Sequence, residues 1–201
     1  FYDATQGEVL VDGVDVRDYT LKALRDKIGY VPQQSFLFKG TIASNVSYGD
    51  KSGGADADMA NVRQACEVAQ ATEFIAKKDN AYESSIAQGG SNVSGGQKQR
   101  LSIARAVYRH PEILIFDDSF SALDFKTDRA VRDALEREAK DSTKLIVAQR
   151  IGTIMNADRI IVLDDGKVVG QGTHKELMDN CEVYRQIAQS QLSENELKGG
   201  R

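Results

Sequence analysis

The sequence predicts an α/β fold with a parallel sheet, covering helices and a small antiparallel part. The apolar runs Ile113 to Phe116 and Leu145 to Ala148 are short and unbroken, which is typical of parallel strands buried on both faces. Segments with helical periodicity separate these runs, as expected of strands joined by helices. Asp117 and Asp118 follow the first run directly, so they lie where open α/β sheets bind ligands, at the carboxyl ends of the strands.

The composition fits one compact domain from a reducing compartment. The chain has 201 residues, of which 41% are hydrophobic, enough for a core. Its net charge of -4 argues against a general nucleic-acid binder, which carries a basic surplus. Cys66 and Cys181 occupy apolar positions without CxxC or His spacing, so we expect buried thiols. No apolar run approaches the ~18 residues of a membrane span and no signal peptide is visible, so any membrane part is expected outside these residues.

The amino-terminal part predicts a hairpin, a helix and a strand. Apolar and polar residues alternate from Val9 to Val16 around an Asp12-Gly13 turn, which indicates a β-hairpin. A short helix is expected from Thr20 to Lys27, followed by a strand from Ile28 to Val31 that ends at Pro32. Gln33 comes next, in a position where a glutamine is ordinary loop chemistry unless its context gives it a role.

A helical insertion is predicted after this strand, because the strand pattern disappears from Gly40 to about Asn92. A loop bearing Gly and Asp spans Lys51 to Ala57. Apolar residues at positions 59, 62, 66 and 69 then recur at helical spacing, and a second helix contains Phe74 and Ile75.

The stretch from Val93 to Asp118 combines two features of a phosphate site. Ser94-Gly95-Gly96 opens a helix, where unpaired N–H groups and the positive end of the helix dipole favour an anion. The helix runs from about Gln97 to Tyr108 and ends at His110-Pro111. Its apolar face carries Leu101, Ala104 and Tyr108. Taken singly, the Ser-Gly-Gly could be a flexible cap and the Asp pair a helix cap, but together they indicate a nucleotide site.

After Asp118 the sequence predicts a helix and a second parallel strand. The helix extends to about Ala139 and carries the i,i+4 pairs Arg129/Asp133 and Arg132/Glu136 on a solvated face. The strand Leu145 to Ala148 completes a βαβ unit, which is expected to place Gln149 beside Asp117.

A hairpin and an amphipathic helix are predicted at the carboxyl-terminal end. Strands at 160–163 and 168–169 are joined by a tight Asp165-Gly166 turn. Thr173 and Glu176 form a capping box for one last helix. That helix carries Leu177, Cys181, Tyr184 and Ala188. The tail from Ser193 to Arg201 is polar.

On these residues the chain resembles the ATP-binding cassette (ABC) ATPases. Val93 to Gln97 resembles the signature motif, and the strand ending in Asp117-Asp118 resembles Walker B. In that family the signature holds the γ-phosphate of an ATP bound by the opposite subunit, and the Walker B Asp, here Asp117, holds Mg²⁺ through water. Gln33, in VPQQSFLFKGTIASNV, resembles the Q-loop glutamine, which reaches Mg²⁺ and the attacking water while its loop senses the transmembrane domain.

Two further loops share the resemblance. Ser121 to Asp124 resembles the D-loop, which crosses the dimer interface and links the two ATP sites. Tyr82 to Gly90 resembles the loop that exporter-type members place against the transmembrane coupling helices, with Gln88 where the family often has Glu. The resemblance implies that Asp117 and Gln33 bind Mg²⁺ and that Asp118 and Gln149 are catalytic. It implies that ATP is bound by Gln33, Val93, Ser94, Gly95, Gly96, Gln97 and Asp124.

The resemblance also implies a division of the chain. Residues 1–39 would form part of the β/ATP-binding core with the Q-loop, and residues 40–107 would form the helical subdomain with the signature. Residues 108–172 would form the Walker B, D-loop and switch part of the α/β core, and residues 173–201 would form a C-terminal helix and tail. The phosphate-cradling motif GxxxxGK[ST] occurs nowhere in the 201 residues. We therefore expect a P-loop-type core truncated after Walker A, with the Walker A strand and loop missing and no activity on its own.

Two positions depart from the family pattern. Competent members carry Glu after the Walker B Asp, where this chain has Asp118, a carboxylate one methylene shorter. They carry His at the end of the next strand, where this chain has Gln149, an amide that cannot become a cation. With an intact VSGGQ, these changes predict the degenerate half of a heterodimeric multidrug or lipid exporter at the cytoplasmic face of a membrane. Its expected cofactors are ATP and Mg²⁺. Its expected partners are a second nucleotide-binding domain and a transmembrane domain, and no nucleic acid is expected.

Two other functions are compatible with parts of the sequence. A soluble ABC ATPase acting on nucleic acid or ribosomes would need long coiled-coil insertions or tandem cassettes, and the sequence contains neither. A non-catalytic interaction fragment would be compatible with the missing phosphate loop. The exporter-like stretches GTIASNV, AQGG and ADRIIVLDDGKVVGQGTH favour the exporter over both.

Overall fold

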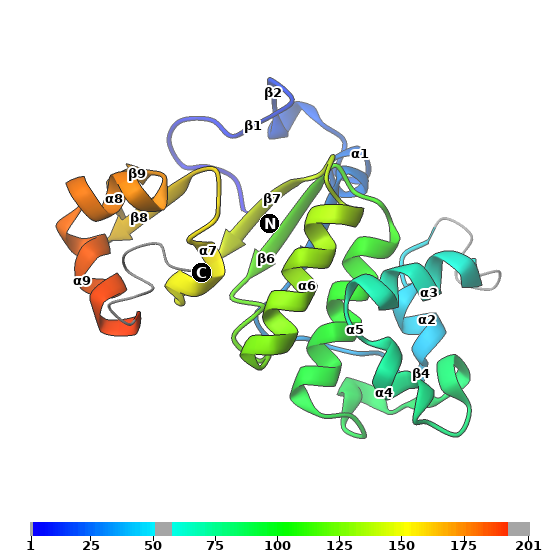
Figure 1. Cartoon of the computed structure of the whole chain (residues 1–201). Helices are drawn as coiled ribbons and strands as arrows, with labels where there is room; N and C mark the ends of the chain where they lie inside the picture. Colours follow the sequence, from blue (N-terminus) through cyan, green and yellow to red (C-terminus); the bar gives the residue numbers. More distant parts are fainter. Residues whose placement is uncertain (1, 51–57, 193–201) are drawn as a thin grey trace. The chain divides into compact units, whose positions relative to one another are not determined.

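The structure, a computed structural model of the chain, describes residues 2–50 and 58–192 (Figure 1). The predicted loop from Lys51 to Ala57 and the predicted polar tail from Ser193 lie outside the described residues. The chain divides into two compact units, residues 1–145 and 146–201, which are described one at a time below. The four-part division expected from the sequence stays a prediction.

The predicted amino-terminal hairpin and helix are present. Strands β1 (Leu10–Val11) and β2 (Val14–Asp15) pair antiparallel. Asp12 and Gly13 both have positive φ, 52° and 77°, as a two-residue hairpin turn requires. A short 3₁₀ turn, η1 (Val16–Asp18), leads to α1 (Leu21–Lys27), whose N-cap Thr20 accepts a hydrogen bond from the Ala23 amide.

A three-stranded sheet lies at the centre of the first unit. It consists of β3 (Ile28–Val31), β6 (Ile113–Asp117) and β7 (Thr143–Val147), in the order β3-β6-β7. Strands β3 and β6 are parallel, with Val31 opposite Phe116, so both end at the same edge of the sheet. Val31, Leu114 and Phe116 are fully buried, and α5 (Gly95–Tyr108) packs against β3.

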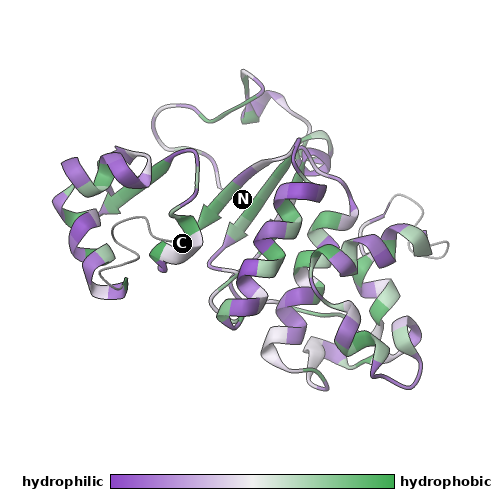
Figure 2. Ribbon diagram, viewed as in Figure 1, coloured by the Kyte–Doolittle hydropathy of each residue, from purple (hydrophilic) through white to green (hydrophobic). Residues whose placement is uncertain are grey.

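The expectation that these strands are buried on both faces was wrong. In β6 the buried residues Leu114 and Phe116 alternate with half-buried ones, and in β7 the side chains of Leu145 and Val147 are 54% and 51% exposed. Both strands are nevertheless strongly hydrophobic (Figure 2). An apolar run shows which side chains are suited to burial, but it does not show which segment packs against them. Among the described residues, one face of the sheet is covered more fully than the other.

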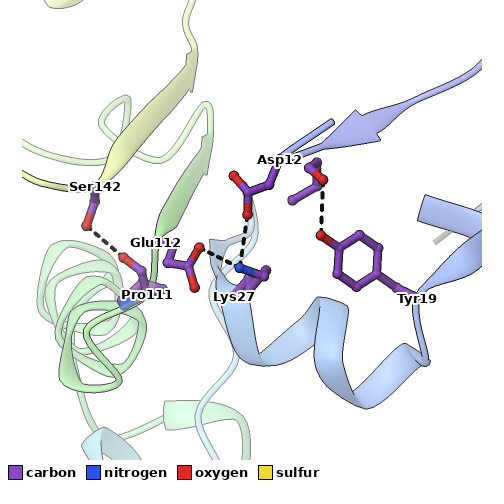
Figure 3. A network of polar contacts seen from close by, with 7 residues as sticks. Asp12, Tyr19, Lys27, Pro111, Glu112 and Ser142 are labelled. Carbon is purple, nitrogen blue, oxygen red and sulfur yellow. Dashed lines mark hydrogen bonds and ion pairs between the residues drawn. The ribbon is translucent and has the colours of Figure 1, made fainter. Parts of the chain in front are cut away.

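A network of polar contacts joins the amino ends of the sheet strands to the hairpin (Figure 3). Lys27 Nζ lies 2.6 Å from a carboxylate oxygen of Glu112 and 2.9 Å from one of Asp12. Hydrogen bonds to these two carboxylates raise the pKa of Lys27, so its ammonium group is charged at neutral pH. The Ser142 hydroxyl donates to the Pro111 carbonyl, at the start of β6. This network lies at the opposite end of the strands from Asp117.

Between β3 and β6 the described residues form four α-helices. They are α2 (Ile42–Val46), α3 (Met59–Val68), α4 (Thr72–Ala76) and α5. The predicted apolar face of α5 is confirmed, because Leu101 and Ala104 are fully buried and Tyr108 is 4% exposed. The expectation that strands disappear here needs a correction. Strands β4 (Gly40–Thr41) and β5 (Ser85–Ile86) pair antiparallel, but two residues are too few to show an alternating pattern. Two 3₁₀ turns, η2 (Ala81–Glu83) and η3 (Gln88–Gly90), flank β5.

Helix α6 (Phe125–Glu138) follows β6, and one of its two predicted ion pairs is different. Arg129 and Asp133 pair as predicted, at 3.9 Å. Arg132 instead pairs with Asp128, at 2.8 Å. Asp128 is only 3% exposed, and a buried carboxylate gains more from a charged partner than a solvated one does.

The second unit has its own small core. It contains α7 (Ile151–Ile154), the antiparallel hairpin β8 (Ile160–Asp164) and β9 (Lys167–Gly172), α8 (His174–Asn180) and α9 (Glu182–Gln191). The predicted turn has positive φ at Asp165 and Gly166, and the Thr173–Glu176 capping box is present. The core consists of Ile151, Ile160, Val162, Leu177, Cys181, Tyr184 and Ala188.

The predicted single last helix is in fact two helices. Cys181 has extended backbone angles, φ -122° and ψ 107°, and separates α8 from α9. Its side chain packs against β9, where a Cβ on Gly170 would lie 2.8 Å from the Cys181 sulfur. Because apolar residues continue at helical spacing across the break, the sequence pattern did not reveal it. Both cysteines are free and buried, as predicted, and burial raises the pKa of Cys66 to about 12.

Replacing Gly29 with alanine is expected to lower the free energy of unfolding by about 1–3 kcal/mol, as overpacking does. A Cβ on Gly29 would lie 2.8 Å from the Ala106 carbonyl oxygen and 2.8 Å from the Pro111 ring. Urea denaturation of the purified protein measures the effect. Gly152→Ala in α7 is a matched control, since a Cβ there meets no atom within 4 Å. Equal stability of the two variants would contradict the close packing of β3 on α5.

Candidate functional site

The carboxyl ends of β3 and β6 bring three predicted site residues together. The Gln33 amide nitrogen donates to a carboxylate oxygen of Asp118 at 3.2 Å. Asp117, at the end of β6, accepts from the Tyr30 hydroxyl at 3.1 Å. The Ser119 hydroxyl donates to the Val31 carbonyl at 2.8 Å and so joins the chain after β6 to the end of β3. The structure therefore places Gln33 beside the Asp pair, while the roles of these residues stay predictions.

Asp118 turns the chain sharply as it leaves β6. Its φ is +44°, in the left-handed region that Asp tolerates better than most residues. The Ser121 hydroxyl donates to the Asp118 carbonyl at 2.8 Å and closes the turn. The backbone at this position therefore favours a short carboxylate over a longer side chain.

Tyr30 is a site residue that the sequence analysis missed. Burial, and then its hydrogen bond to Asp117, raise the pKa of Tyr30, so the phenol is protonated and donates at neutral pH. Its position one residue before the end of a parallel strand was the available signal. A Tyr in a strand is usually a packing residue, so that signal was not enough to identify it.

The amino end of α5 is an open, capped helix terminus. The Ser94 hydroxyl accepts from the Gln97 amide at 3.3 Å, and the Gln97 side chain accepts from the Ser94 amide at 3.1 Å. This is a capping box, and it fixes the direction in which the helix begins. Within the part of the chain that the structure describes, nothing lies within 4 Å of where a Cβ on Gly95 would be, so the first helical turn is accessible. Val93 precedes it in a turn closed onto the Gly90 carbonyl.

The residues that follow Gln97 hold α5 in place. The Arg100 guanidinium donates to the Gln70 carbonyl at 2.7 Å and lies 4.8 Å from the centre of the Phe74 ring. Gln99 is buried, with 2% of its surface exposed. Gln99 and Arg100 are thus committed to packing, and the backbone groups at Ser94 to Gly96 are open to an anion.

The segment after Gln33 is fastened to α2 and α5. Arg105 donates to the Phe36 carbonyl at 2.9 Å and to the Asn45 carbonyl at 2.8 Å. Asn45 in turn exchanges two hydrogen bonds of 2.8 Å with the backbone of Phe38. Burial lowers the pKa of Arg105 to about 10, which leaves it charged at neutral pH. These bonds fix the chain from Phe36 onward.

Two loops meet on this side of the first unit. The Gly89 amide donates to the Leu37 carbonyl at 2.8 Å, and the Gln88 side chain accepts from the Lys39 amide at 3.1 Å. Two aromatic side chains remain exposed beside them, Phe36 at 47% and Tyr48 at 52%. Their common neighbour Phe38 stacks on Tyr48 and meets Phe36 edge-on.

Asp124 is the N-cap of α6. Its carboxylate accepts from the Thr127 amide at 2.9 Å and from the Thr127 hydroxyl at 2.7 Å, and these bonds lower the pKa of Asp124. The same loop passes α5, where a Cβ on Gly96 would lie 3.5 Å from the Ala122 carbonyl oxygen. A role of Asp124 toward ATP stays a prediction.

Gln149 lies in the second unit. Its carbonyl accepts from the Gln191 amide at 2.8 Å, and the same Gln191 side chain accepts from the Ile151 amide at 2.9 Å. The start of α7 is thus tied to the end of α9. The expected place of Gln149 beside Asp117, and its catalytic role, stay predictions.

The donor set at the strand ends suits Mg²⁺ bound with a nucleotide. Mg²⁺ prefers oxygen ligands and is commonly held by one or two carboxylates, with water and phosphate oxygens completing its shell. Asp117 and Asp118 supply two carboxylates there, and the Gln33 side chain supplies an amide oxygen. Within residues 2–50 and 58–192, no group of three or more His, Cys, Asp or Glu side chains could hold a metal alone.

Comparison with known proteins decides which family has this arrangement. Residues 1–121, more than half of the chain, match the family described as ABC transporter. The chain belongs to the ABC transporter family. The resemblance inferred from the signature and Walker B stretches is therefore confirmed.

The similar proteins are much longer than this chain. It is 48% identical over 192 residues to an uncharacterized ABC transporter ATP-binding protein of Mycobacterium tuberculosis, covering 94% of the chain and 32% of that protein. It is 44% identical over 196 residues to an ATP-dependent lipid A-core flippase of Vibrio vulnificus, covering 96% of the chain and 33% of the flippase. The chain thus spans about a third of the length of these relatives.

A solved structure confirms the predicted fold class. The structure of a bacterial Atm1-family ABC exporter with ATP bound is similar to this cassette with a TM-score of 0.90 and 36% identity, over 96% of the chain and 33% of the exporter. Both the parallel sheet with its helices and the small antiparallel pairs were expected for such a cassette. A search of the described residues for a helix long and apolar enough to cross a membrane finds none.

Proposed function

We propose that these residues form the ATP-binding cassette of a membrane exporter, which binds ATP with Mg²⁺ and dimerises to drive transport. The observation that carries the proposal is the set of residues at the ends of β3 and β6, where Gln33 meets Asp118 beside Asp117. When bound, Mg²⁺ would neutralise phosphate charge and orient the nucleotide. Asp117 would hold the ion, and Gln33 would position groups around it.

The open terminus of α5 supports a composite site shared with a second nucleotide-binding domain. Its amides and helix dipole suit a γ-phosphate, and none of the described residues crowds Gly95. In this arrangement Ser94 and Gly95 serve the nucleotide of the partner, with Val93, Gly96 and Gln97 framing the same turn. Asp124 and its loop cross between the two sites.

The chain's own site is proposed to be the degenerate one of the pair. A general base contributes roughly 10²–10⁴-fold to a rate, and Asp118 is a methylene shorter than Glu. Gln149 can donate a hydrogen bond to a phosphate but cannot transfer a proton. This site would hold ATP and hydrolyse it slowly, while the signature completes the hydrolytic site of a different partner subunit. The 201-residue polypeptide on its own would be inactive.

The aromatic surface made by Phe36, Phe38 and Tyr48 is proposed to face a transmembrane domain. Exposed aromatic side chains at a site where two loops meet are typical of a protein contact. The Tyr82 to Gly90 loop, which the family places against coupling helices, lies there through Gly89 and Gln88. The cassette would thus lie at the cytoplasmic face of a membrane, without a nucleic-acid partner.

Nucleotide binding by the full-length protein tests the proposal. ATP affinity should rise with Mg²⁺, and Asp117→Asn should abolish that dependence while ATP binding without Mg²⁺ stays unchanged. Calorimetry at a series of Mg²⁺ concentrations measures both. The exporter function would be contradicted if ATP affinity did not depend on Mg²⁺. It would also be contradicted if ATP turnover were stimulated by ribosomes or DNA and not by transported substrate in vesicles.

Tyr30→Phe should raise the half-saturating Mg²⁺ concentration for ATP binding by about 10-fold. Partners that orient a metal-binding carboxylate affect metal affinity by about 10–100-fold. The phenol is the group that orients Asp117, and phenylalanine keeps the ring while removing that donor. Tyr19→Phe is the matched control, because its hydroxyl bonds the Val11 carbonyl and not a carboxylate of the site. Equal Mg²⁺ titrations for both variants would rule out the orienting role.

A further inference from the structure

The short segment that carries Gln33 depends on few contacts for its position. Upstream, β3 ends at Val31, whose carbonyl is bonded by Ser119. Downstream, Arg105 fixes the Phe36 carbonyl. In the described part of the chain, the segment from Pro32 to Ser35 makes two side-chain hydrogen bonds, Gln33 to Asp118 and Ser35 to Gln99.

Gln99 lies on α5 and is the buried partner of this segment. The Ser35 hydroxyl donates to its side-chain oxygen at 2.5 Å. The Gln99 side-chain nitrogen is buried and has no hydrogen-bond partner among the described residues. A buried amide with an unused donor is less stable than an apolar side chain of the same shape. A contribution to stability therefore does not explain why position 99 is a glutamine. The hydrogen bond between Gln99 and Ser35 does explain it.

We propose that Gln99 is a positioning residue that holds Gln33 at Asp118 and ties the Q-loop to the signature helix. The inference rests on the proposed ATPase function of the site. Gln99 lies two residues beyond Gln97, so one short stretch of α5 contains both the capping box and the tether to Ser35. A displacement of the helix is then passed to Ser35 directly.

The hydrogen bond made by Gln33 is sensitive to such a displacement. At 3.2 Å from Asp118 its amide nitrogen is at the long end of the normal range, so a shift of well under 1 Å breaks the bond. Ser35 is only two residues away, and loss of its tether frees the chain from Val31 to Phe36. The bonds of Arg105 remain, so the rest of the loop keeps its place.

Gln99→Met tests this inference in the full-length protein with its partner subunit. Methionine fills a similar volume without a hydrogen bond and removes the unused donor, so the melting temperature should stay the same or rise. We expect the half-saturating Mg²⁺ concentration for ATP binding at this chain's own site to rise about 10-fold, because partners that orient groups around a metal affect its affinity by about 10–100-fold. Total turnover should change little, since this site is proposed to hydrolyse ATP slowly. Amide hydrogen exchange in residues 32–36 should become faster.

Three further variants separate positioning from simple structural damage. Ser35→Ala should reproduce the effects, and the double variant with Gln99→Met should add nothing, whereas Ser35→Thr keeps the hydroxyl and should behave as wild type. Asn61→Ala is the matched control, since Asn61 tethers the other end of α5 through the Tyr108 carbonyl at 2.8 Å. It should lower the melting temperature and leave exchange in residues 32–36 unchanged.

Two outcomes overturn the inference. One is unchanged hydrogen exchange and an unchanged Mg²⁺ requirement in Gln99→Met, and the other is additive losses in the double variant accompanied by a lower melting temperature. A wild-type protein that neither binds nor hydrolyses ATP would instead contradict the proposed function. Hydrogen exchange would still report in that case whether Gln99 positions the segment.

Discussion

Gly95→Asp is expected to lower ATP turnover of the assembled exporter by roughly 10²-fold, the typical loss when a donor to the transition state is removed. The variant should fold normally, because no atom of residues 2–50 and 58–192 lies within 4 Å of a Cβ on Gly95 and an acidic residue suits the first turn of a helix. Its carboxylate would instead occupy the approach of a phosphate to the α5 terminus. Steady-state phosphate release by the purified transporter measures the effect.

Ser94→Ala should act in the same direction for a different reason. It removes a hydroxyl that could donate to a phosphate, and it also removes the cap of α5, which costs about 1 kcal/mol. Melting temperatures separate these two effects, and Gly95→Asp is free of the second. Asp118→Asn is the control at the chain's own site and should reduce turnover much less, because that carboxylate is proposed to be a poor base. Full activity of Gly95→Asp would mean that the α5 terminus contacts no nucleotide.

The arrangement at the strand ends was predictable from the sequence because it depends on local signals. Asp117 follows an unbroken apolar run and Gln33 follows another strand, and parallel pairing brings such positions to one edge. The helix start at Ser94-Gly95-Gly96 was equally local, and the structure adds that Ser94 and Gln97 form its capping box. Each of these inferences needed only a few neighbouring residues.

The structure corrected the inferences that depend on partners distant in sequence. Tyr30 bonds a residue 87 positions away, and Ser35 bonds one 64 positions away. Neither partner can be identified from spacing along the chain. The exposed faces of Leu145 and Val147 and the break at Cys181 have the same origin, because apolar periodicity marks what should be buried without showing what lies against it.

Asp118→Glu combined with Gln149→His is expected to create a working hydrolytic site on this chain. The clearest background is an exporter whose partner subunit has lost its own base, so that turnover is low. There the double variant should raise turnover by about 10²-fold, the lower bound of what a general base contributes. Glutamate extends the carboxylate by one methylene toward the attacking water, and histidine can be charged beside the γ-phosphate. Phosphate release at saturating Mg²⁺ and ATP measures the gain.

The backbone at Asp118 limits this gain and provides a control. Its φ of +44° suits aspartate, so glutamate should cost of order 1 kcal/mol of stability there. Gln149→His alone avoids that cost and should give a smaller gain, because it supplies a charged group without a better placed base. If the unmodified chain already sustains near-normal turnover with the partner's base removed, Asp118 is itself a working base. The assignment of this chain as the degenerate half would then be wrong, whereas its membership of the ABC transporter family would stand.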